Sequence, residues 1–598
     1  MHIIICIPLS HPVRAEVTIP GSKSYTNRAV LIAAMIKGIV VIKNPLFSDD
    51  TLAMIHCLRT LGIEIDIKTD CIKVIGSLDD IKNGDYVLNA QLSGTTLRFL
   101  LPLLTIVLGT KILTGGEGLR KRPIKELVDA LRTLGADIAY IDTPDYPPLR
   151  VTASTFRAQK IVLDGGVSSQ YISALLMIAP LVSPFTIEVH GVQISKPYID
   201  MTIDIMKQFG VVVVSEAIND MCHTYFVSGQ QMYHAKKYVV EGDFSGAGYF
   251  FAIAALTRST LKIKNLNPDS VQPDKKLLSV LEQMGSKIIY SKKAITIQGG
   301  GVKPMEIQVV DCPDQAQTLA VLAAFAQGST TLLGVRSLHG KETERVVALE
   351  QELRRMQIGV VSTIDTMTIT GGNPQPARIR TYGDHRMAMS FAIAGAQLHN
   401  MEICHPEVVT KTFPDFWKQY HNIGIRTKKV TPHIILIGMR GSGKTTVAQL
   451  LSAQLHIPCI DLDSLVVQKT GMSIADIVAT HGWDYFRERE SEIVRDITSH
   501  SPMIIATGGG VVVRSHNTTV LKKRGIMILL TCSVETMALR IAGNREIPFL
   551  TDKKNMREEL EEIDRARKQL YEDAADYIIN TDNRTPTAIV QEIISRCL

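Results

Sequence analysis

One pattern of apolar and polar positions recurs along positions 1–425: a helix that ends in Leu-x-x-Leu-Gly or a close variant, followed by an alternating strand. Residues 58–62 run into a strand at 63–67 in this way, and 294–298 show the same period of two. Glycine suits the helix end because it adopts the left-handed conformation at little cost. The closing positions are nearly evenly spaced, at Gly62, Gly135, Gly210, Gly285, Gln357 in the glycine position, and Gly424 in a weaker sixth copy. Six such units predict a pseudo-symmetric α/β structure rather than a doubly wound sheet.

The repeat gives way to a polar stretch at 426–432, and a new apolar strand begins at 433–437. We therefore expect a linker at 426–432 and a separate domain at 433–598. The new strand leads into G-x-x-x-x-G-K-T at 438–445 and then into a helical pattern, which is the context of a phosphate-binding P-loop. In such a loop the lysine reaches the β- and γ-phosphates of ATP and the threonine hydroxyl binds Mg²⁺. The predicted ATP-binding residues are Gly438, Gly441, Gly443, Lys444, Thr445 and Thr446.

Two carboxylates, Asp461 and Asp463, follow the next predicted strand at 457–460. If the strand geometry continues, its period of two points both to the same side, where one can join the metal shell and the other can take an acceptor hydroxyl. A pair of solvated turn carboxylates is an equally common reading. Arg487 begins a charged helix and can hold a substrate carboxylate bidentately, although a lone arginine is more often a surface residue. Residues 507–510 place a glycine turn just after a strand.

With these segments in place, residues 433–598 resemble shikimate kinase over nearly their whole length. The matching pieces are the P-loop, Asp461-x-Asp463, Arg487, the glycine turn at 508–510 and the segment 567–571. The resemblance implies a P-loop parallel-sheet fold, with ATP as phosphoryl donor and Mg²⁺ at Thr445 and Asp461. It also implies that shikimate contacts Asp463, Arg487, Gly509 and Arg567, with Asp463 positioning or deprotonating its 3-hydroxyl.

One departure from that family concerns the lid over the phosphates. Ile547 stands where the family usually has an arginine, and positive charge at the transferring phosphoryl group is central to catalysis. Arg545, two residues earlier, is a candidate substitute; a solvated lid arginine is the alternative. A kinase-like module that is weak or non-catalytic, fused as a scaffold or ligand sensor, is therefore an alternative function for this domain.

Three charged clusters stand out in the repeat region, at 21–28, 341–345 and 383–389. The first precedes a helical apolar pattern, so its cations lie near a helix N-terminus, where anions bind favourably. Any one cluster alone is more often a solvated charge run. Together, spread over different repeats, they indicate a cleft for a ligand with several negative charges.

These clusters, in order, resemble 5-enolpyruvylshikimate-3-phosphate (EPSP) synthase. The matching segments span the whole repeat region: 21–28, 93–98, 122–124, 168–170, 195–198, 313–314, 341–345, 384–389 and 411–415. The resemblance implies two lobes of three βαβαββ units each within residues 1–425, one lobe from 1–20 plus 240–425 and the other from 21–239. Leu92, Gly246, Ser337 and His339 depart from the residues common in that family.

The roles that the resemblance implies fit the chemistry of the substrates. Phosphoenolpyruvate carries a phosphate and a carboxylate, and its cations would be Lys23, Arg122, Arg345, Arg386 and Lys411. Shikimate 3-phosphate would contact Ser24, Arg28, Ser168, Ser169, Ser195 and Lys341, and Gln170 would touch both ligands. Gly94 is a further substrate-binding residue by the same resemblance. Addition needs a base on the 5-hydroxyl and an acid on the methylene carbon, and elimination reverses the proton traffic. Asp314 and Glu342 are the candidates, assisted by Lys23; cations around a carboxylate lower its pKa, which suits a base better than an acid.

Composition narrows the partners and the setting. The 598 residues carry a net charge of +6, too weak a bias to indicate nucleic acid. Nine scattered cysteines without a CxxC pair are typical of reduced thiols, and no apolar run approaches the ~18 residues of a membrane helix. We therefore expect a cytoplasmic enzyme that acts on small-molecule substrates and has no membrane or nucleic-acid partner. A related enolpyruvyl transferase acting on a UDP-sugar is the nearest alternative for the repeat region. If both domains are active, fusion would raise the local concentration of their shared intermediate.

Overall fold

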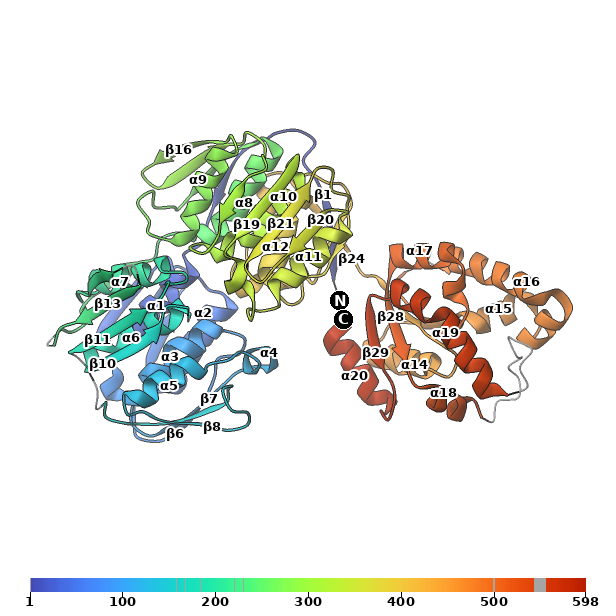
Figure 1. The fold of residues 1–598 in the computed structure, drawn as a ribbon, viewed down its shortest axis with the longest axis horizontal. Helices are drawn as coiled ribbons and strands as arrows, with labels where there is room; N and C mark the ends of the chain where they lie inside the picture. Colours follow the sequence, from blue (N-terminus) through green and yellow to red (C-terminus); the bar gives the residue numbers. More distant parts are fainter. Residues whose placement is uncertain are drawn as a thin grey trace. The chain divides into compact units, whose positions relative to one another are not determined.

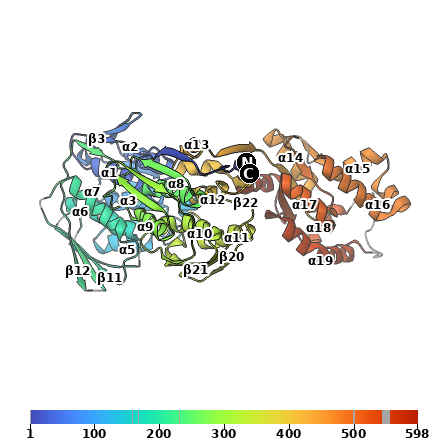
Figure 2. The same cartoon turned by 90° about the horizontal axis from the view of Figure 1, so that it is seen from above.

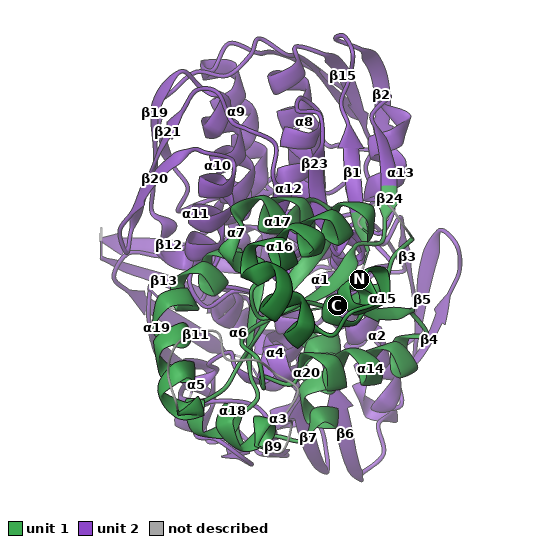
Figure 3. Ribbon diagram, turned by 90° about the vertical axis from the view of Figure 1, so that its right-hand side faces the viewer, with its two compact units in different colours: residues 1–3, 429–598 green, residues 4–428 purple. Residues whose placement is uncertain are grey.

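The computed structural model describes residues 2–156, 159–166, 168–182, 184–219, 221–229, 231–497, 501–542 and 555–597. Its internal contacts divide the chain into two compact units (Figure 3). The larger unit comprises residues 4–428, and the smaller comprises residues 429–598 together with 1–3.

Six four-stranded sheets form the larger unit, one for each predicted repeat. The sheet β10-β11-β13-β12 is mixed: β10 pairs in parallel with β11, whereas β11 and β12 both run antiparallel to β13. The strands are β1 (Ile3–Ile7), β2 (Arg14–Thr18), β3 (Ile39–Lys43), β4 (Glu64–Ile67), β5 (Cys71–Ile75), β6 (Asp85–Asn89), β7 (Thr110–Thr114), β8 (Asp137–Tyr140), β9 (Leu149–Thr152), β10 (Lys160–Asp164), β11 (Phe185–His190), β12 (Val214–Asn219), β13 (Cys222–Val227), β14 (Lys237–Val239), β15 (Thr260–Lys264), β16 (Lys287–Ser291), β17 (Ala294–Gln298), β18 (Glu306–Gln308), β19 (Gly328–Leu333), β20 (Gly359–Ser362), β21 (Thr366–Gly371), β22 (Arg378–Ile379), β23 (Met401–Cys404) and β24 (Arg426–Val430).

Two hydrophobic cores lie in this unit and define its two lobes. The core of lobe I is built from buried residues between Tyr25 and Val240, and that of lobe II from residues before Ile19 and after Phe244. A backbone bridge between Gly21 and Gly242 joins the two places where the chain passes from lobe to lobe. At the centre of lobe II, α8, α10 and α12 pack against one another (Figures 1 and 2). The helices are α1 (Lys23–Ala33), α2 (Asp49–Thr60), α3 (Gly94–Ile106), α4 (Glu117–Arg120), α5 (Lys125–Thr133), α6 (Ser169–Val182), α7 (Pro197–Gln208), α8 (Phe244–Thr257), α9 (Lys276–Gln283), α10 (Ala316–Phe325), α11 (Arg345–Arg355), α12 (His385–Gly395) and α13 (Phe416–Asn422).

The predicted helix-closing positions adopt the left-handed backbone. Gly62 has φ of 104° and Gly285 has φ of 110°, directly after α2 and α9 end. Gln357, in the glycine position of the fifth repeat, has φ of 63°, a conformation that costs a side chain more than it costs glycine. The prediction of repeated left-handed helix ends is thus confirmed, and in the fifth repeat packing overrides local preference.

The segment 426–432, which its polar sequence presents as a linker, has a different structure. Arg426–Val430 forms β24, the edge strand beside β1 in the sheet β22-β23-β1-β24. The sixth repeat needs a fourth strand to complete its sheet, and lysines such as Lys428 and Lys429 are tolerated at an exposed edge.

The smaller unit is a parallel five-stranded sheet of order β26-β27-β25-β28-β29 covered by helices on both faces. In β25, Ile434 and Leu436 pack toward α14 and α20, whereas Ile435 and Ile437 pack toward the opposite face. A strand buried on both faces is a continuous apolar run, as 433–437 is in the sequence. Its elements are β25 (His433–Ile437), β26 (Cys459–Asp461), β27 (Ile504–Ala506), β28 (Gly525–Thr531), β29 (Tyr577–Asn580), α14 (Lys444–Leu455), α15 (Leu462–Thr470), α16 (Ile474–Ile497), α17 (Ser515–Arg524), α18 (Val534–Ile541), α19 (Met556–Ala574) and α20 (Pro586–Cys597). Among all the described helices, none has the length and apolar character needed to cross a bilayer.

Candidate active sites

A cleft of about 400 Å³ in the larger unit is lined by side chains from both lobes. It collects most of the residues that the sequence singles out from distant repeats: Lys23, Ser24, Arg28, Gly94, Arg122, Ser168, Ser169, Gln170, Ser195, Asp314, Lys341, Glu342, Arg345 and Arg386. Lys411 reaches the same cleft through Glu342, whose Oε1 accepts from its Nζ at 2.9 Å.

Helix N-termini from different repeats open onto this cleft. Lys23, Gly94 and Ser169 are the first residues of α1, α3 and α6, and Arg345 is the first residue of α11. The free N–H groups and the dipole at a helix N-terminus favour negative charge. The backbone therefore adds to the positive potential that the lysine and arginine side chains create.

Arg345 organises the carboxylates of the cleft. Only 2% of its surface is exposed, and its Nε donates to Oδ2 of Asp384 at 2.8 Å. One terminal nitrogen donates to Oε2 of Glu342 at 2.9 Å, and the other lies 3.5 Å from Oδ1 of Asp314. Three acidic groups from three different segments thus share one buried guanidinium, which fixes the positions of Asp314 and Glu342 relative to each other.

Arg386 and Arg122 complete the cationic wall. Arg386 donates to Oδ2 of Asp314 at 2.6 Å and to its backbone carbonyl at 3.1 Å. A terminal nitrogen of Arg122 lies 3.7 Å from Oε1 of Glu342. Lys23, at the start of α1, pairs with Asp50 at 3.2 Å.

These surroundings change the acidity of the cleft carboxyls. Burial alone would raise the pKa of Asp314, but Arg386 and Arg345 bring it below its ordinary value. Burial likewise opposes ionisation of Glu342, and Lys411 and Arg345 outweigh it, so its pKa lies well below the usual range. Both carboxyls are therefore anions, as their cationic neighbours predict. Burial lowers the pKa of Lys341 to about 8.

The lobe I side of the cleft is held by a polar network. Arg28 donates to Oγ1 of Thr202 at 2.8 Å and to the carbonyls of Ser24 and Tyr198, so the protein orients its guanidinium. Oε1 of Gln170 accepts from Arg98 at 2.9 Å. Across the lobes, the Tyr198 hydroxyl donates to Oδ2 of Asp314 at 3.2 Å.

The smaller unit carries the predicted P-loop between β25 and α14. Its glycines Gly438, Gly441 and Gly443 have φ of 143°, 78° and 96°, a conformation that turns the loop around a central space. Nζ of Lys444 donates to the carbonyls of Gly438 and Met439 at 2.9 Å each. Thr446 follows in the first turn of α14. The Thr445 hydroxyl donates to Oδ2 of Asp461 at 2.7 Å, which brings two oxygen ligands of the kind Mg²⁺ prefers together beside the loop.

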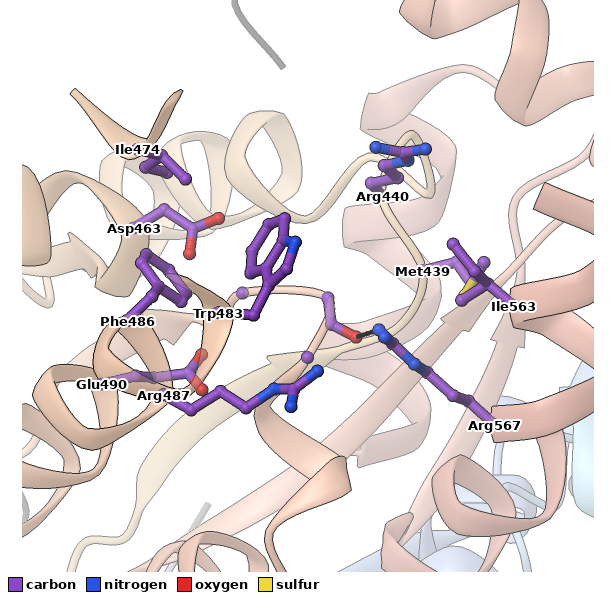
Figure 4. A pocket seen from close by; sticks show the side chains of 13 residues that line it. Met439, Arg440, Asp463, Ile474, Trp483, Phe486, Arg487, Glu490, Ile563 and Arg567 are labelled. Atoms are coloured by element: carbon purple, nitrogen blue, oxygen red, sulfur yellow. Dashed lines mark hydrogen bonds between the residues drawn. The ribbon is translucent and has the colours of Figure 1, made fainter. Parts of the chain in front are cut away.

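Beside the P-loop lies a cavity of about 150 Å³ (Figure 4). Arg487 and Arg567 reach it from α16 and α19, and a terminal nitrogen of Arg567 donates to the Gly509 carbonyl at 3.0 Å. Its apolar wall consists of Met439, Ile474, Trp483, Phe486 and Ile563. A small ligand with both a carboxylate and a ring fits this combination of apolar wall and paired arginines.

Asp461 and Asp463 meet the site in a way that differs from the strand geometry considered above. β26 ends at Asp461, which caps α15 by accepting from the Ser464 N–H at 3.3 Å, and Asp463 lies in the first helical turn. Burial, and then the charge of Asp461, raise the pKa of Asp463 to about 6. The two carboxylates therefore lie in different surroundings, one beside Thr445 and the other in the cavity.

Comparison with known proteins now assigns the larger unit. Residues 8–420, more than half of the chain, match EPSP synthase (3-phosphoshikimate 1-carboxyvinyltransferase). The chain belongs to the EPSP synthase family. Residues 440–598 match the shikimate kinase family, so the chain is a fusion of an EPSP synthase domain and a shikimate kinase domain, both of them transferases.

Individual relatives agree with this assignment. A 3-phosphoshikimate 1-carboxyvinyltransferase of Sulfurovum sp. (strain NBC37-1) is 39% identical over 418 residues, which cover 69% of this chain and 97% of that protein. The pentafunctional AROM polypeptide 2 of Lodderomyces elongisporus is 33% identical over 615 residues, covering 95% of this chain and 39% of that protein. A solved EPSP synthase of Acinetobacter baumannii, 23% identical, has the same fold over 72% of this chain and its own whole length, with a TM-score of 0.61.

Several residues of the two sites are not predicted by the sequence patterns. Asp50 pairs with Lys23. Asp384 lies in the cluster 383–389, but its particular role, holding Arg345 while capping α12, is visible only in the structure. Behind Asp314 in the EPSP synthase domain, Asp274 accepts from Ser245, and burial followed by the charge of Asp314 raises its pKa to about 7. No motif contains Asp50 or Asp274; the fold brings Asp50 to the cleft and buries Asp274 near Asp314.

Glu490 is the corresponding residue of the shikimate kinase domain. It lines the cavity of Figure 4 with only 1% of its surface exposed. Burial, and then the charge of Asp463, raise its pKa to about 8. Its one signal in the sequence is its spacing of three from Arg487, which places both on one helix face. Arg545 and Ile547, the lid residues considered above, lie outside the described residues.

Proposed function

We propose that the two domains catalyse consecutive reactions. The shikimate kinase domain transfers a phosphoryl group from ATP to the 3-hydroxyl of shikimate, and the EPSP synthase domain transfers enolpyruvyl from phosphoenolpyruvate to the 5-hydroxyl of shikimate 3-phosphate. The observation that carries the second reaction is the carboxylate pair Asp314 and Glu342, held by Arg345 in a cationic cleft. The name of the bacterial relative favours shikimate 3-phosphate over a UDP-sugar as acceptor.

Phosphoenolpyruvate binds among the cations of the cleft, Lys23, Arg122, Arg345, Arg386 and Lys411. All of these except Lys23, which pairs with Asp50, now contact Asp314 or Glu342. As these donors turn to the ligand, the carboxylates lose part of the interaction that lowers their pKa. Binding therefore prepares groups that are too acidic in the free enzyme to carry a proton through the reaction.

Asp314 and Glu342 have different neighbours, and this divides the two proton transfers between them. Asp314 accepts from Tyr198 of lobe I, on the side of the acceptor, so it takes the proton of the 5-hydroxyl. Glu342 contacts Lys411 and lies near Arg122, so it takes up a proton from solvent when phosphoenolpyruvate draws these cations away, and delivers it to the methylene carbon. Elimination then returns a methyl proton to Glu342, and Asp314 gives the proton of the 5-hydroxyl to the departing phosphate. Shikimate 3-phosphate is held by Ser24, Arg28, Ser168, Ser169, Gln170, Ser195 and Lys341, and Gly94 borders the substrates in the same cleft.

In the shikimate kinase domain, Asp463 positions the 3-hydroxyl and accepts its proton. Arg487 and Arg567 hold the substrate carboxylate, and the backbone of Gly509 borders the ring. The pairing of Thr445 with Asp461 supports a Mg²⁺ site at these two oxygens, where the ion would neutralise phosphate charge. The match to the shikimate kinase family gives no support to the alternative of a non-catalytic module.

A single assay on the full-length protein tests both halves. With ATP, shikimate and phosphoenolpyruvate, the wild type should form the enolpyruvyl product. The Lys444→Ala variant should make it only from added shikimate 3-phosphate, and Asp314→Asn should accumulate shikimate 3-phosphate from shikimate. Product from shikimate 3-phosphate but none from shikimate plus ATP in the wild type would refute the kinase half.

A further inference from the structure

Three side chains with metal-binding atoms meet on the outward face of the sheet β10-β11-β13-β12 in lobe I. They are Glu188 and His190 of β11 and Cys222 of β13. A carboxylate oxygen, an imidazole nitrogen and the thiol sulfur all lie within 4.8 Å of one another. None of the three lines the catalytic cleft, and the proposed chemistry uses none of them.

The strand register produces this arrangement. His190 is paired directly with Cys222 across the antiparallel ladder, so both side chains stand on the same face. Glu188 precedes His190 by two residues and shares that face through the period of the strand. The intervening Val189 is buried in the core of lobe I, so the face that carries the three donors is the solvent side. Ligands mounted on paired strands are held more rigidly than ligands on a loop.

The donor set selects the chemical class of ion. Sulfur and imidazole nitrogen suit Zn²⁺ and related borderline metals, whereas Mg²⁺ and Ca²⁺ prefer oxygen alone. In the structure, Nε2 of His190 lies 2.5 Å from Oε1 of Glu188, a hydrogen-bonding contact between the two groups. A divalent ion can take the place of the hydrogen atom that joins them. Lys160 lies 2.5 Å from the other carboxylate oxygen and so leaves Oε1 for the ion.

The neighbouring strand supplies further oxygen. Asp164 of β10 is the register partner of His190 in the parallel ladder and lies on the same face. Its Oδ1 accepts from the Gly166 N–H at 2.6 Å. A carboxylate on this side, or solvent, can complete the four-coordinate shell that Zn²⁺ prefers.

We propose that Glu188, His190 and Cys222 form a binding site for a Zn²⁺-type divalent ion. The site stands at the carboxyl ends of β10 and β11, where the chain leaves for the segments that carry Ser169 and Ser195. Those strand ends are already joined, since Gly165 donates to the His190 carbonyl at 2.6 Å and Ile194 donates to the Gly165 carbonyl at 3.0 Å. An ion bound to His190 therefore braces, from outside the cleft, the strand ends next to the lining residues Gly166 and Ile194.

Cobalt substitution tests the site in the full-length protein. Co²⁺ bound to a thiolate gives a charge-transfer absorption that Co²⁺ on oxygen or nitrogen ligands does not give. Excess Mg²⁺ and ATP are included to occupy the P-loop. The wild type should show the band with one equivalent of Co²⁺, and Zn²⁺ should displace it. Cys222→Ser and His190→Gln should both lose it.

The control is Cys459→Ser, which removes another half-buried thiol, from β26 of the shikimate kinase domain, and should keep the band. Circular dichroism of each variant confirms that the fold is retained. A band that survives in Cys222→Ser, or one that the wild type never shows, would overturn the proposal. A chromophoric chelator titrated against Zn²⁺ gives the second readout, in which the wild type should retain one ion more than Cys222→Ser.

Discussion

Nζ of Lys411 lies 2.9 Å from Oε1 of Glu342, while Arg345 donates to the other oxygen of the same carboxylate. The two cations come from segments that are far apart in the sequence. Glu342 is thus held as an anion in a largely buried position. In the reaction proposed above, an anionic ligand competes for both donors, and this one contact pair would couple its binding to proton transfer.

Replacing Glu342 by Gln keeps the shape of the side chain and removes its ability to carry a proton. We expect kcat of enolpyruvyl transfer to fall about 10²–10⁴-fold, the usual contribution of a positioned acid or base. Binding of shikimate 3-phosphate, measured by calorimetry, should be unchanged. The matched control is Glu344→Gln, two residues along and exposed to solvent, which should turn over like the wild type. Equal rates for the two variants would exclude Glu342 from proton transfer.

Asp384 has a double structural role, since it accepts from Nε of Arg345 and caps α12 through the Arg386 N–H at 2.8 Å. Asp384→Ala removes the cap and leaves a buried guanidinium with one partner fewer. We expect a loss of about 2–4 kcal/mol in the stability of the EPSP synthase domain. Scanning calorimetry measures this loss in the unfolding transition of the EPSP synthase domain, which is the one whose midpoint temperature shikimate 3-phosphate raises. Asp415→Ala, at the start of α13 where the side chain makes no capping bond, should change that transition little.

Gly508 leaves no room for a side chain in the shikimate kinase domain. A Cβ atom there would lie 2.5 Å from Oδ1 of Asp463 and 2.8 Å from Oε1 of Glu490. Gly508→Ala should therefore displace Asp463 and lower kcat/KM for shikimate by about 10²-fold. A Cβ atom at Gly510 would have its nearest neighbour, a terminal nitrogen of Arg567, 4.0 Å away, so Gly510→Ala should remain active. Enolpyruvyl transfer from added shikimate 3-phosphate reports whether each protein is intact.

The raised pKa of Glu490 predicts how the stability of the shikimate kinase domain depends on pH. Burial lifts this pKa from 4.5 to about 8, so the folded domain holds the proton more tightly than the unfolded chain does. The stability that this bound proton contributes to the folded domain is complete below pH 4.5 and is lost as the pH rises toward 8. The unfolding transition of this domain is the one whose midpoint temperature ATP raises. In Glu490→Gln, that midpoint should fall less steeply with pH over this range than in the wild type. Glu488→Gln, at an exposed position of the same helix, should keep the wild-type slope; parallel curves for all three proteins would contradict the assignment.

The sequence predicts the fold wherever one short pattern reports one local conformation. Gly62 and Gly285 close their helices as expected, and the P-loop glycines take the positive φ that their motif requires. It fails where a tertiary partner decides the conformation. β26 does not continue as far as Asp463. It ends at Asp461, whose side chain caps α15, so Asp463 lies in a helix and not in a strand.

The candidate sites divide in the same way. Cations grouped in motifs, such as Lys341 through Arg345, could be found from sequence because several such clusters recur in different repeats, although any one of them alone is more often a solvated charge run. The roles of Asp50, Asp274 and Glu490 depend on burial and on partners far along the chain. Apart from the spacing of Glu490 from Arg487, the local sequence gives no indication of either property.

The edge strand β24 determines where this chain can be cut. A recombinant fragment ending at residue 425 would strip β1 of its outer neighbour and expose a row of unpaired backbone groups, which invites association with other chains. Only Thr431 and Pro432 lie between the end of β24 and the start of β25. Limited proteolysis or gene splitting should therefore yield a well-behaved EPSP synthase fragment only when the break falls after Val430.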